Sequence, residues 1–264
     1  MSNPAEGYES FMVPTLFRPW AEKLIEAAAP AKGERVLDVG CGTGIVARLA
    51  AARLGSAASV TALDPSANML TVARAAAAIE GVAIEWREGS AEQLPFPEQS
   101  FDLVLCQFAL MFFADKSMAL GEMRRVATRN GRVVLNVWQG LDRHPFYQLL
   151  HEVIQRRVGV SALEDIFALG SADALRRMGS SAGFREVQIE PVSMTARFPN
   201  PDGFLAGEIE VDTAAIPSMQ HLDTAARGRI VAAIAADMKA PLVEVTRGDQ
   251  VVLPFHAFRM TLRP

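Results

Sequence analysis

The chain has 264 residues, of which 50% are hydrophobic, and a formal net charge of −4 at pH 7. This length allows a large buried core, and this composition excludes an intrinsically disordered protein. The acidic balance, without a long basic run, argues against nucleic acid as the main partner. We also expect no membrane span, because no apolar run is long enough to cross a bilayer and no signal peptide is recognisable. Two cysteines, Cys41 and Cys106, are too few for a disulfide framework and predict a cytoplasmic protein.

Strand and helix patterns alternate through the first half of the chain. The expected strands are apolar runs at residues 35–39, 60–64, 83–87, 101–107 and 132–138. The expected helices between them are residues 43–54, 65–79 and 116–128. Such alternation predicts a parallel sheet with helices on both faces.

The rhythm changes after residue 138. Residues 139–170 predict one or two helices without a strand, and Ser171 is a candidate N-cap for a helix that ends at Gly183. Strand patterns return at 186–197 and 251–262, on either side of a mostly helical stretch, 199–247. We expect these two late strands to pair as an antiparallel hairpin at a sheet edge.

A glycine-rich turn follows the first strand and carries the most specific signal in the chain. Gly40, Gly42 and Gly44 alternate as G-x-G-x-G, and Asp38 lies two residues before the first glycine. Glycines let the backbone turn sharply and let a ligand lie against it, and Thr43 could cap the following helix. The pattern predicts a nucleotide-binding site.

The acid before the glycines helps to distinguish the nucleotide. A dinucleotide pyrophosphate needs bare N–H groups and G-x-G-x-x-G spacing, and a nearby carboxylate opposes it. S-adenosylmethionine instead carries a sulfonium and an ammonium, which suit Asp38. A second acid, Asp64, ends the second strand and could hold ribose hydroxyls in either kind of cofactor.

The string Val36-Leu37-Asp38-Val39-Gly40-Cys41-Gly42-Thr43-Gly44 resembles the first motif of class I S-adenosylmethionine-dependent methyltransferases. Residues 8–138 are similar to small-molecule methyltransferases of the ubiquinone/menaquinone-biosynthesis type. The resemblance implies an α/β fold, with a Rossmann-like seven-stranded, mostly parallel sheet, an antiparallel last strand and helical lid insertions. It implies one methyltransferase domain over 1–264, with an N-terminal helical lid (1–33), a cofactor-binding core (34–138) and substrate-cap insertions (139–170 and 199–247).

The resemblance also implies which side chains and backbone groups contact S-adenosylmethionine. Asp38 would serve the cationic end, Asp64 the ribose, Met69 the adenine and the Gln107 carbonyl the ammonium. Ser90 stands where the family commonly has an aspartate on the adenine amine. Its hydroxyl could accept the same hydrogen bond more weakly, or a backbone group at Ala91 could carry the contact instead. The remaining expected cofactor residues are Gly40, Cys41, Gly42, Gly44, Pro65, Glu92, Phe108, Tyr8 and Trp20. Cys41 is expected as a small packing residue, and Arg18 as a partner for the carboxylate of the cofactor.

The implied reaction is methyl transfer from S-adenosylmethionine to a small-molecule oxygen, carbon or nitrogen, by in-line displacement that leaves S-adenosylhomocysteine. His144, just past the fifth strand, is the candidate general base, and His151, His221 and His256 are alternatives. Neither CxxC nor HExxH occurs, so we predict no metal.

Aromatic residues near the expected cleft favour a partly apolar or aromatic acceptor. These residues are Phe108, Phe112, Phe113 and Phe146. The protein would be a monomer or homodimer. Two alternatives remain at this point, a non-catalytic S-adenosylmethionine-binding protein and a nicotinamide-dependent oxidoreductase.

Overall fold

The computed structural model describes residues 4–55 and 59–264. The chain begins with a short helix, α1 (Pro4–Gly7), a π-helix, η1 (Tyr8–Phe17), and α2 (Arg18–Ala28). The helical character expected for 1–33 is therefore confirmed for most of its described part, and residues 1–3 lie outside the described residues.

A parallel half-sheet follows. Its elements are β1 (Arg35–Val39), α3 (Ile45–Leu54), β2 (Ser59–Asp64), α4 (Ala67–Glu80), β3 (Glu85–Glu88), β4 (Phe101–Gln107), η2 (Leu110–Phe112), α5 (Lys116–Val126) and β5 (Ala127–Trp138). β1 pairs in parallel with β2 and β4, β2 with β3, and β4 with β5. Apolar side chains of α2 and α3 pack with those of β1, β2 and β4 in one buried core.

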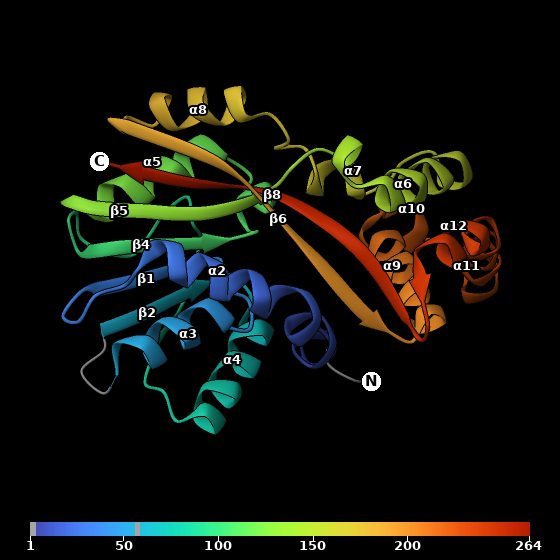
Figure 1. The fold of residues 1–264 in the computed structure, drawn as a ribbon, viewed down its shortest axis with the longest axis horizontal. Helices are drawn as coiled ribbons and strands as arrows, with labels where there is room; N and C mark the ends of the chain where they lie inside the picture. The colour runs from blue at the N-terminus through green and yellow to red at the C-terminus, as the bar shows by residue number, and fades with distance from the viewer. Residues whose placement is uncertain (1–3, 56–58) are drawn as a thin grey trace. The chain divides into compact units, whose positions relative to one another are not determined.

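The rest of the chain adds helices and two long strands. In order these are η3 (Leu141–Arg143), α6 (Pro145–Val158), α7 (Leu163–Ile166), α8 (Ala172–Ser181), β6 (Glu186–Pro199), α9 (Pro201–Ala215), α10 (Pro217–Gln220), α11 (Thr224–Asp237), α12 (Lys239–Val245), β7 (Thr246–Arg247) and β8 (Gln250–Arg263). The sheet order is β3-β2-β1-β4-β5-β8-β6, with β7 paired to β8. Figure 1 shows β8 running opposite to its neighbours, so the predicted Rossmann-like α/β sheet with an antiparallel last strand is confirmed. Among the strands of the described residues, the short β7 was not predicted.

The boundary between α5 and β5 differs from the prediction. The Asn130-Gly131 pair was expected to turn the chain into a strand at residue 132, but β5 already begins at Ala127. The pairing moves from Phe101↔Ala127 to Leu103↔Arg132, so β5 carries three more residues than β4 across this step. The extra residues form an irregularity within the strand, which a propensity-based turn signal cannot distinguish from a true turn.

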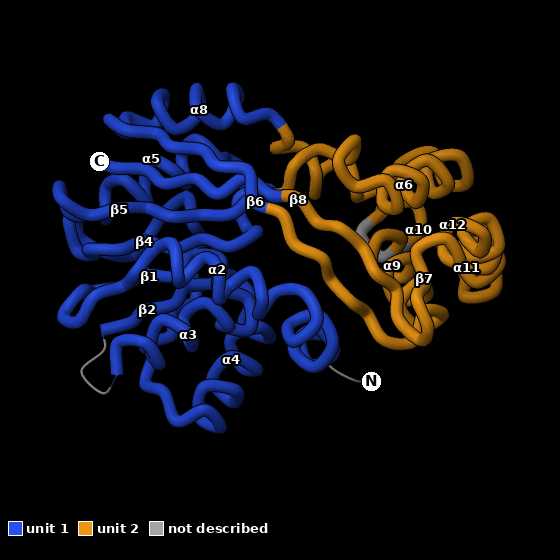
Figure 2. The backbone as a smooth tube through the Cα atoms, viewed as in Figure 1, with its two compact units in different colours: residues 1–137, 171–192, 257–264 blue, residues 138–170, 193–256 orange. Residues whose placement is uncertain are grey.

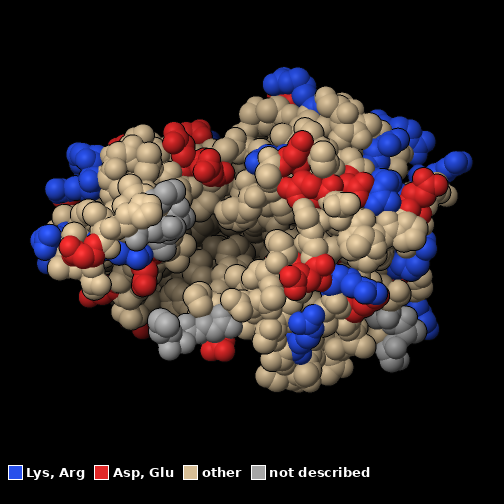
Figure 3. Space-filling model, turned by 180° about the vertical axis from the view of Figure 1, so that it is seen from behind, with Lys and Arg blue, Asp and Glu red and all other residues tan. Residues whose placement is uncertain are grey.

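The chain forms two compact units (Figure 2). Unit 1 comprises residues 1–137, 171–192 and 257–264, and unit 2 comprises 138–170 and 193–256. Acidic and basic side chains are interspersed on the visible surface of each unit (Figure 3). Among the residues described, no helix combines the length and the apolar character needed to cross a membrane.

Candidate cofactor site

The glycine turn after β1 is fixed to the end of β2 by backbone hydrogen bonds. The amides of Gly40 and Cys41 both donate to the carbonyl of Leu63, at 2.8 and 3.0 Å. The amide of Gly44 donates to the carbonyl of Cys41 at 2.8 Å. The turn is therefore held at the carboxyl ends of two neighbouring parallel strands, where open α/β sheets bind their ligands.

Asp64 connects this turn to the start of α4. Its Oδ2 accepts a hydrogen bond from the Gly42 amide at 2.8 Å, and its Oδ1 accepts one from the Ser66 amide at 2.9 Å. The N-cap of α4 is Ser66, which accepts from the amide of Met69. A carboxylate oxygen has two lone-pair positions, so both oxygens of Asp64 retain the capacity to accept a ribose hydroxyl.

Asp38 of β1 accepts a hydrogen bond from the first turn of α3. Its side chain is 1% exposed, and its Oδ2 accepts a hydrogen bond from the Ala47 amide at 3.0 Å. Burial raises the pKa of Asp38 to about 7, the Ala47 amide opposes that rise, and the charge of Asp64 adds to it. The prediction that Thr43 caps this helix is wrong, because Gly44 is the N-cap and the buried Thr43 hydroxyl has no partner among the described residues.

The three glycines of the turn have different surroundings. A Cβ at Gly40 would lie 2.5 Å from the Cβ of Ala109, and one at Gly44 would lie 2.5 Å from the Trp86 ring. A Cβ at Gly42 would meet nothing within 4 Å, and this residue has a φ of +55°. The first and third glycines therefore allow close packing, whereas Gly42 borders open space into which a ligand can fit.

An aromatic group from the N-terminal helices lies beside the exit of β4. The Phe108 ring lies 5.4 Å from that of Trp20 and 6.2 Å from that of Phe17, which stacks on Tyr8 at 5.1 Å. Burial raises the pKa of Tyr8, with further contributions from nearby acids that include Asp64 and Asp38. Tyr8 therefore lies near Asp38, at the end of β1, and near Asp64, the last residue of β2.

Gln107 gives a second indication of a ligand. Its Nε2 donates to the carbonyl of Phe17 at 3.1 Å, while its buried Oε1 has no partner in the described part of the chain. A buried acceptor without a donor is costly, and an ammonium group would satisfy it. The open space at Gly42 and this acceptor together fit an S-adenosylmethionine molecule, with the side chain of Gln107 available besides the predicted backbone carbonyl.

The loop after β3 is organised around Glu92. The Ser90 hydroxyl donates to the Glu92 carboxylate, and Glu92 Oε1 accepts from the Ala114 amide at 2.9 Å. The hydroxyl expected at the adenine is therefore already engaged within its own loop. Ala91 is buried beside it, whereas Met69 is partly exposed and Pro65 is exposed at the start of α4.

Two side chains near the turn have structural roles. Arg18 donates to Glu80 at 2.9 Å, so the predicted partner of a cofactor carboxylate is already paired with an acid. Burial raises the pKa of the Cys41 thiol, which keeps it protonated and fits the expectation of a small packing residue.

His144 does not have the geometry expected of a general base. It is 1% exposed, its Nδ1 lies 3.0 Å from the Gly140 carbonyl, and its Nε2 accepts from the His256 amide at 3.0 Å. Burial, the largest effect, lowers the pKa of His144 to about 4. Both ring nitrogens join backbone segments of unit 2, so His144 has a structural role, and its role as general base stays a prediction.

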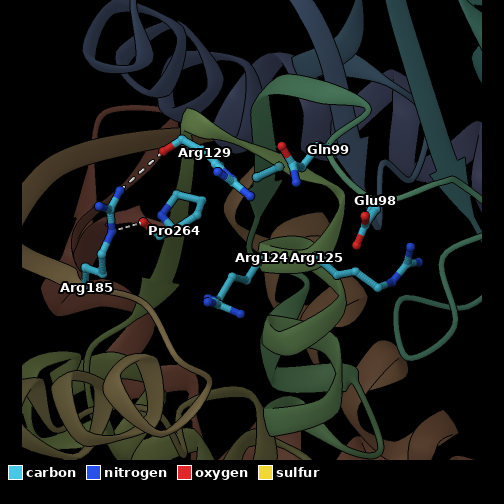
Figure 4. Close-up of a pocket in the computed structure, with 8 residues that line it drawn as sticks. Glu98, Gln99, Arg124, Arg125, Arg129, Arg185 and Pro264 are labelled. Atoms are coloured by element: carbon cyan, nitrogen blue, oxygen red, sulfur yellow. Dashed lines mark hydrogen bonds between the residues drawn. The ribbon is translucent and has the colours of Figure 1, made fainter.

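A pocket of about 360 Å³ lies elsewhere in unit 1 (Figure 4). Its lining residues include Arg124, Arg129 and Arg185. It lies near the amino ends of β4 and β5, whereas the predicted cofactor residues gather at the carboxyl ends of the strands. It is therefore separate from the cofactor site.

The comparisons with known proteins agree with this geometry. Residues 37–135 match the family described as "Methyltransferase domain". The ubiquinone/menaquinone biosynthesis C-methyltransferase of Nitrosospira multiformis is 33% identical over 187 residues, which cover 66% of this chain and 76% of the relative. The corresponding enzyme of Neisseria meningitidis serogroup B is 32% identical over 190 residues, 67% of this chain and 78% of the relative.

A solved structure shares the fold. Phosphoethanolamine N-methyltransferase 2 of Haemonchus contortus, in complex with S-adenosylhomocysteine, matches with a TM-score of 0.57 at 20% identity. The match covers 93% of this chain and 52% of the chain in that structure. At this identity the likeness shows the fold alone, and the curated relatives show the family. The chain belongs to the class I S-adenosylmethionine-dependent methyltransferases similar to the ubiquinone/menaquinone-biosynthesis type, and it is an enzyme that transfers a methyl group from S-adenosylmethionine to a small-molecule acceptor.

Proposed function

We propose that S-adenosylmethionine binds in unit 1 at the glycine turn, between the ends of β1, β2 and β4. The observation that carries this proposal is the open space at Gly42, whose amide is held by Asp64 at 2.8 Å. A carboxylate that fixes the turn and still has free lone pairs is suited to hold a ribose beside it.

The remaining contacts follow from the positions of the side chains. Asp38 supplies negative charge to the cationic methionine end, and Gln107 Oε1 accepts a hydrogen bond from its ammonium. Met69, Ala91 and the loop from Ser90 to Glu92 border the adenine, with Pro65 beside them. Gly40 and Gly44 keep the turn close-packed, Cys41 fills space within it, and Tyr8, Trp20 and Phe108 form an aromatic wall.

The bound cofactor supplies an electrophilic methyl group on a positively charged sulfur. The protein residues hold the donor in one orientation and exclude water, which can supply much of the rate of an in-line displacement. The acceptor must approach the methyl group from the side opposite the sulfur, and its bond to carbon forms as the sulfur–carbon bond breaks.

We also propose the finer organisation of the protein. Residues 1–33 serve as an N-terminal lid, 34–138 as the cofactor core, and 139–170 and 199–247 as acceptor caps within one methyltransferase domain. The acceptor is partly apolar or aromatic, and the protein acts as a monomer or homodimer. A cytoplasmic location is supported by Cys41 and Cys106, which are both buried free thiols.

Asp64→Asn tests the proposed site. The substitution replaces one carboxylate oxygen with an amide donor, which faces the Gly42 or Ser66 amide and weakens the ribose contact. We expect the affinity for S-adenosylhomocysteine, measured by titration calorimetry, to fall by about 1–3 kcal/mol. The exposed Asp173→Asn in the same unit serves as the control and should bind as the parent does. Unchanged affinity in Asp64→Asn would remove this residue from the site.

A further inference from the structure

Unit 2 contains a buried polar cluster that the proposed cofactor site does not use. α6 carries Tyr147 and His151, and α9 carries Glu208 and Asp212. Each pair is spaced four residues apart and so lies on one helix face. The Tyr147 hydroxyl donates to the Glu208 carboxylate, and His151 interacts electrostatically with Asp212. We call these four residues the α6–α9 cluster.

Two atoms of the α6–α9 cluster are buried without a partner. Asp212 is 3% exposed, and its carboxylate is hydrogen-bonded to the Ser161 hydroxyl, at 3.4 Å from Oδ2, and to the backbone of Ala162 and Leu163, but its Oδ1 has no partner within 3.5 Å among the described residues. The Nδ1 of His151, a residue that is 8% exposed, likewise has none in that part of the chain. A buried polar atom without a partner is costly, so two in one cluster point to a missing polar group.

The carboxylates of the cluster also lack a lysine or arginine partner among the described residues, and the positive charge that acts on Asp212 is that of His151. Within the described residues, neither Glu208 nor Asp212 forms an ion pair with a lysine or arginine, whereas the nearby Asp237 pairs with Arg157 at 2.8 Å. Burial raises the pKa of Glu208 to about 7 and also raises the pKa of Asp212. Buried carboxylates are normally paired with a cation, so two carboxylates beside a single histidine favour a cationic ligand over a neutral or anionic one.

Aromatic rings adjoin this acidic cluster. The Tyr147 ring lies 5.8 Å from Phe146, 5.7 Å from Phe167 and 5.5 Å from Phe255. Aromatic faces attract cations and pack against an apolar body. Glu208 is partly exposed, whereas the other members of the cluster are buried.

We propose that the α6–α9 cluster binds the ammonium group of an amine-bearing small molecule whose apolar body packs on the neighbouring aromatic rings. An ammonium has three donors. The cluster offers carboxylate acceptors for them, namely the Glu208 carboxylate and Asp212 Oδ1. That this amine is the methyl acceptor rests on the proposed function, whereas amine binding by unit 2 does not.

The test compares two probes of the same shape, 2-phenylethylamine and 2-phenylethanol, by calorimetric titration into the full-length protein. We expect the amine to bind at least about tenfold more tightly than the alcohol. Glu208→Gln and Asp212→Asn should each remove most of this preference. Glu210→Gln, on an exposed position of the same helix, is the matched control and should retain it. Thermal melting followed by circular dichroism checks that each variant is folded, and the partly exposed Glu208 keeps the test valid if Asp212→Asn does not fold.

Three results would overturn the proposal. These are equal binding of the two probes, no measurable binding of the amine at millimolar concentration, and a preference that survives in Glu208→Gln. S-adenosylhomocysteine is titrated into the same samples. If S-adenosylhomocysteine does not bind the parent protein, that result counts against the proposed function. The comparison of the two probes would still decide whether unit 2 has an amine site.

Discussion

At the scale of single residues, the side chains predicted for the cofactor also hold the turn together. Asp64 fixes the Gly42 amide, and Asp38 accepts the Ala47 amide of the first turn of α3. A helix N-terminus needs such acceptors, and a buried carboxyl group supplies one. The two carboxyl groups that we propose for cofactor recognition thus also support the local fold.

Gly42→Val tests cofactor binding apart from local folding, because the added side chain would enter the open space proposed for the cofactor. We expect binding of S-adenosylhomocysteine to become undetectable by calorimetry. The control is Gly81→Val, at a position in the same unit that also has a positive φ, +70° compared with +55°, and nothing within 4 Å of a Cβ. Both variants bear a backbone strain of about 1–2 kcal/mol, but only Gly42→Val should lose the ligand. Equal binding by the two variants would contradict a cofactor at Gly42.

Residue roles could be predicted from sequence where they depend on short spacing. Asp38, the alternating glycines and Asp64 mark the turn because strand, turn and helix are consecutive in the chain. The role of His144 could not be predicted, because its Nε2 partner is the amide of His256, 112 residues away. The acidic residues of the α6–α9 cluster were also missed, although Glu208 and Asp212 have a four-residue spacing that could have indicated a shared helix face.

At the scale of elements, a buried arginine joins the N-terminal π-helix to two helices of the core. Arg48 of α3, whose side chain is 2% exposed, contacts Glu9 of η1 at 2.6 Å and Glu80 of α4 at 2.7 Å. Arg18 of α2 also contacts Glu80, but its side chain is 37% exposed. The same acid therefore has one buried and one solvated partner.

These two arginines should differ in their contribution to stability. We expect Arg48→Met to lower the free energy of unfolding by about 1–3 kcal/mol, less than a fully buried pair because both acids are partly exposed. Arg18→Met should lower it by less than about 1 kcal/mol. Urea unfolding of the two variants measures both values, and an equal loss would show that the burial of Arg48 is not what makes its contacts strong.

Element boundaries were less predictable than the elements themselves. Each long strand was predicted within a few residues of its position, because apolar, β-branched runs mark buried strands. β5 begins at Ala127, five residues before the predicted start at residue 132. Its irregular pairing depends on the neighbouring strand β4, which the local sequence does not reveal. The two-residue β7 has too few residues for any periodic pattern.

At the scale of the whole molecule, His144 should influence the stability of the protein at acidic pH. The folded protein lowers its pKa to about 4, whereas the unfolded chain has the ordinary value of about 6.5. Between these values the unfolded chain binds a proton that the folded chain does not. The stabilisation is therefore complete above pH 6.5 and is lost as the pH falls toward 4.

His144→Gln should remove this contribution. Relative to the variant, the parent should lose about 3 kcal/mol of unfolding free energy between pH 6.5 and pH 4. Urea unfolding at several pH values gives the difference, in which effects common to both proteins, such as the titration of Asp38, cancel. Parallel pH profiles for the two proteins would show that His144 titrates normally in the folded state.

The architecture of the molecule could be predicted because alternating elements with short connections leave few topologies for a parallel sheet. The division into two units could not, since it depends on which helices of 139–170 and 199–247 pack together. Those helices contact one another and the long ends of β6 and β8, which lie far apart in sequence.

A crystal structure with S-adenosylhomocysteine tests the central claim most directly. We predict that the ribose hydroxyls lie within hydrogen-bond distance of the Asp64 carboxylate, and that the homocysteine ammonium lies at Asp38 or at Gln107 Oε1. The ligand should fill the space in front of Gly42. A ligand bound away from the glycine turn, or one whose ribose makes no contact with Asp64, would contradict the account.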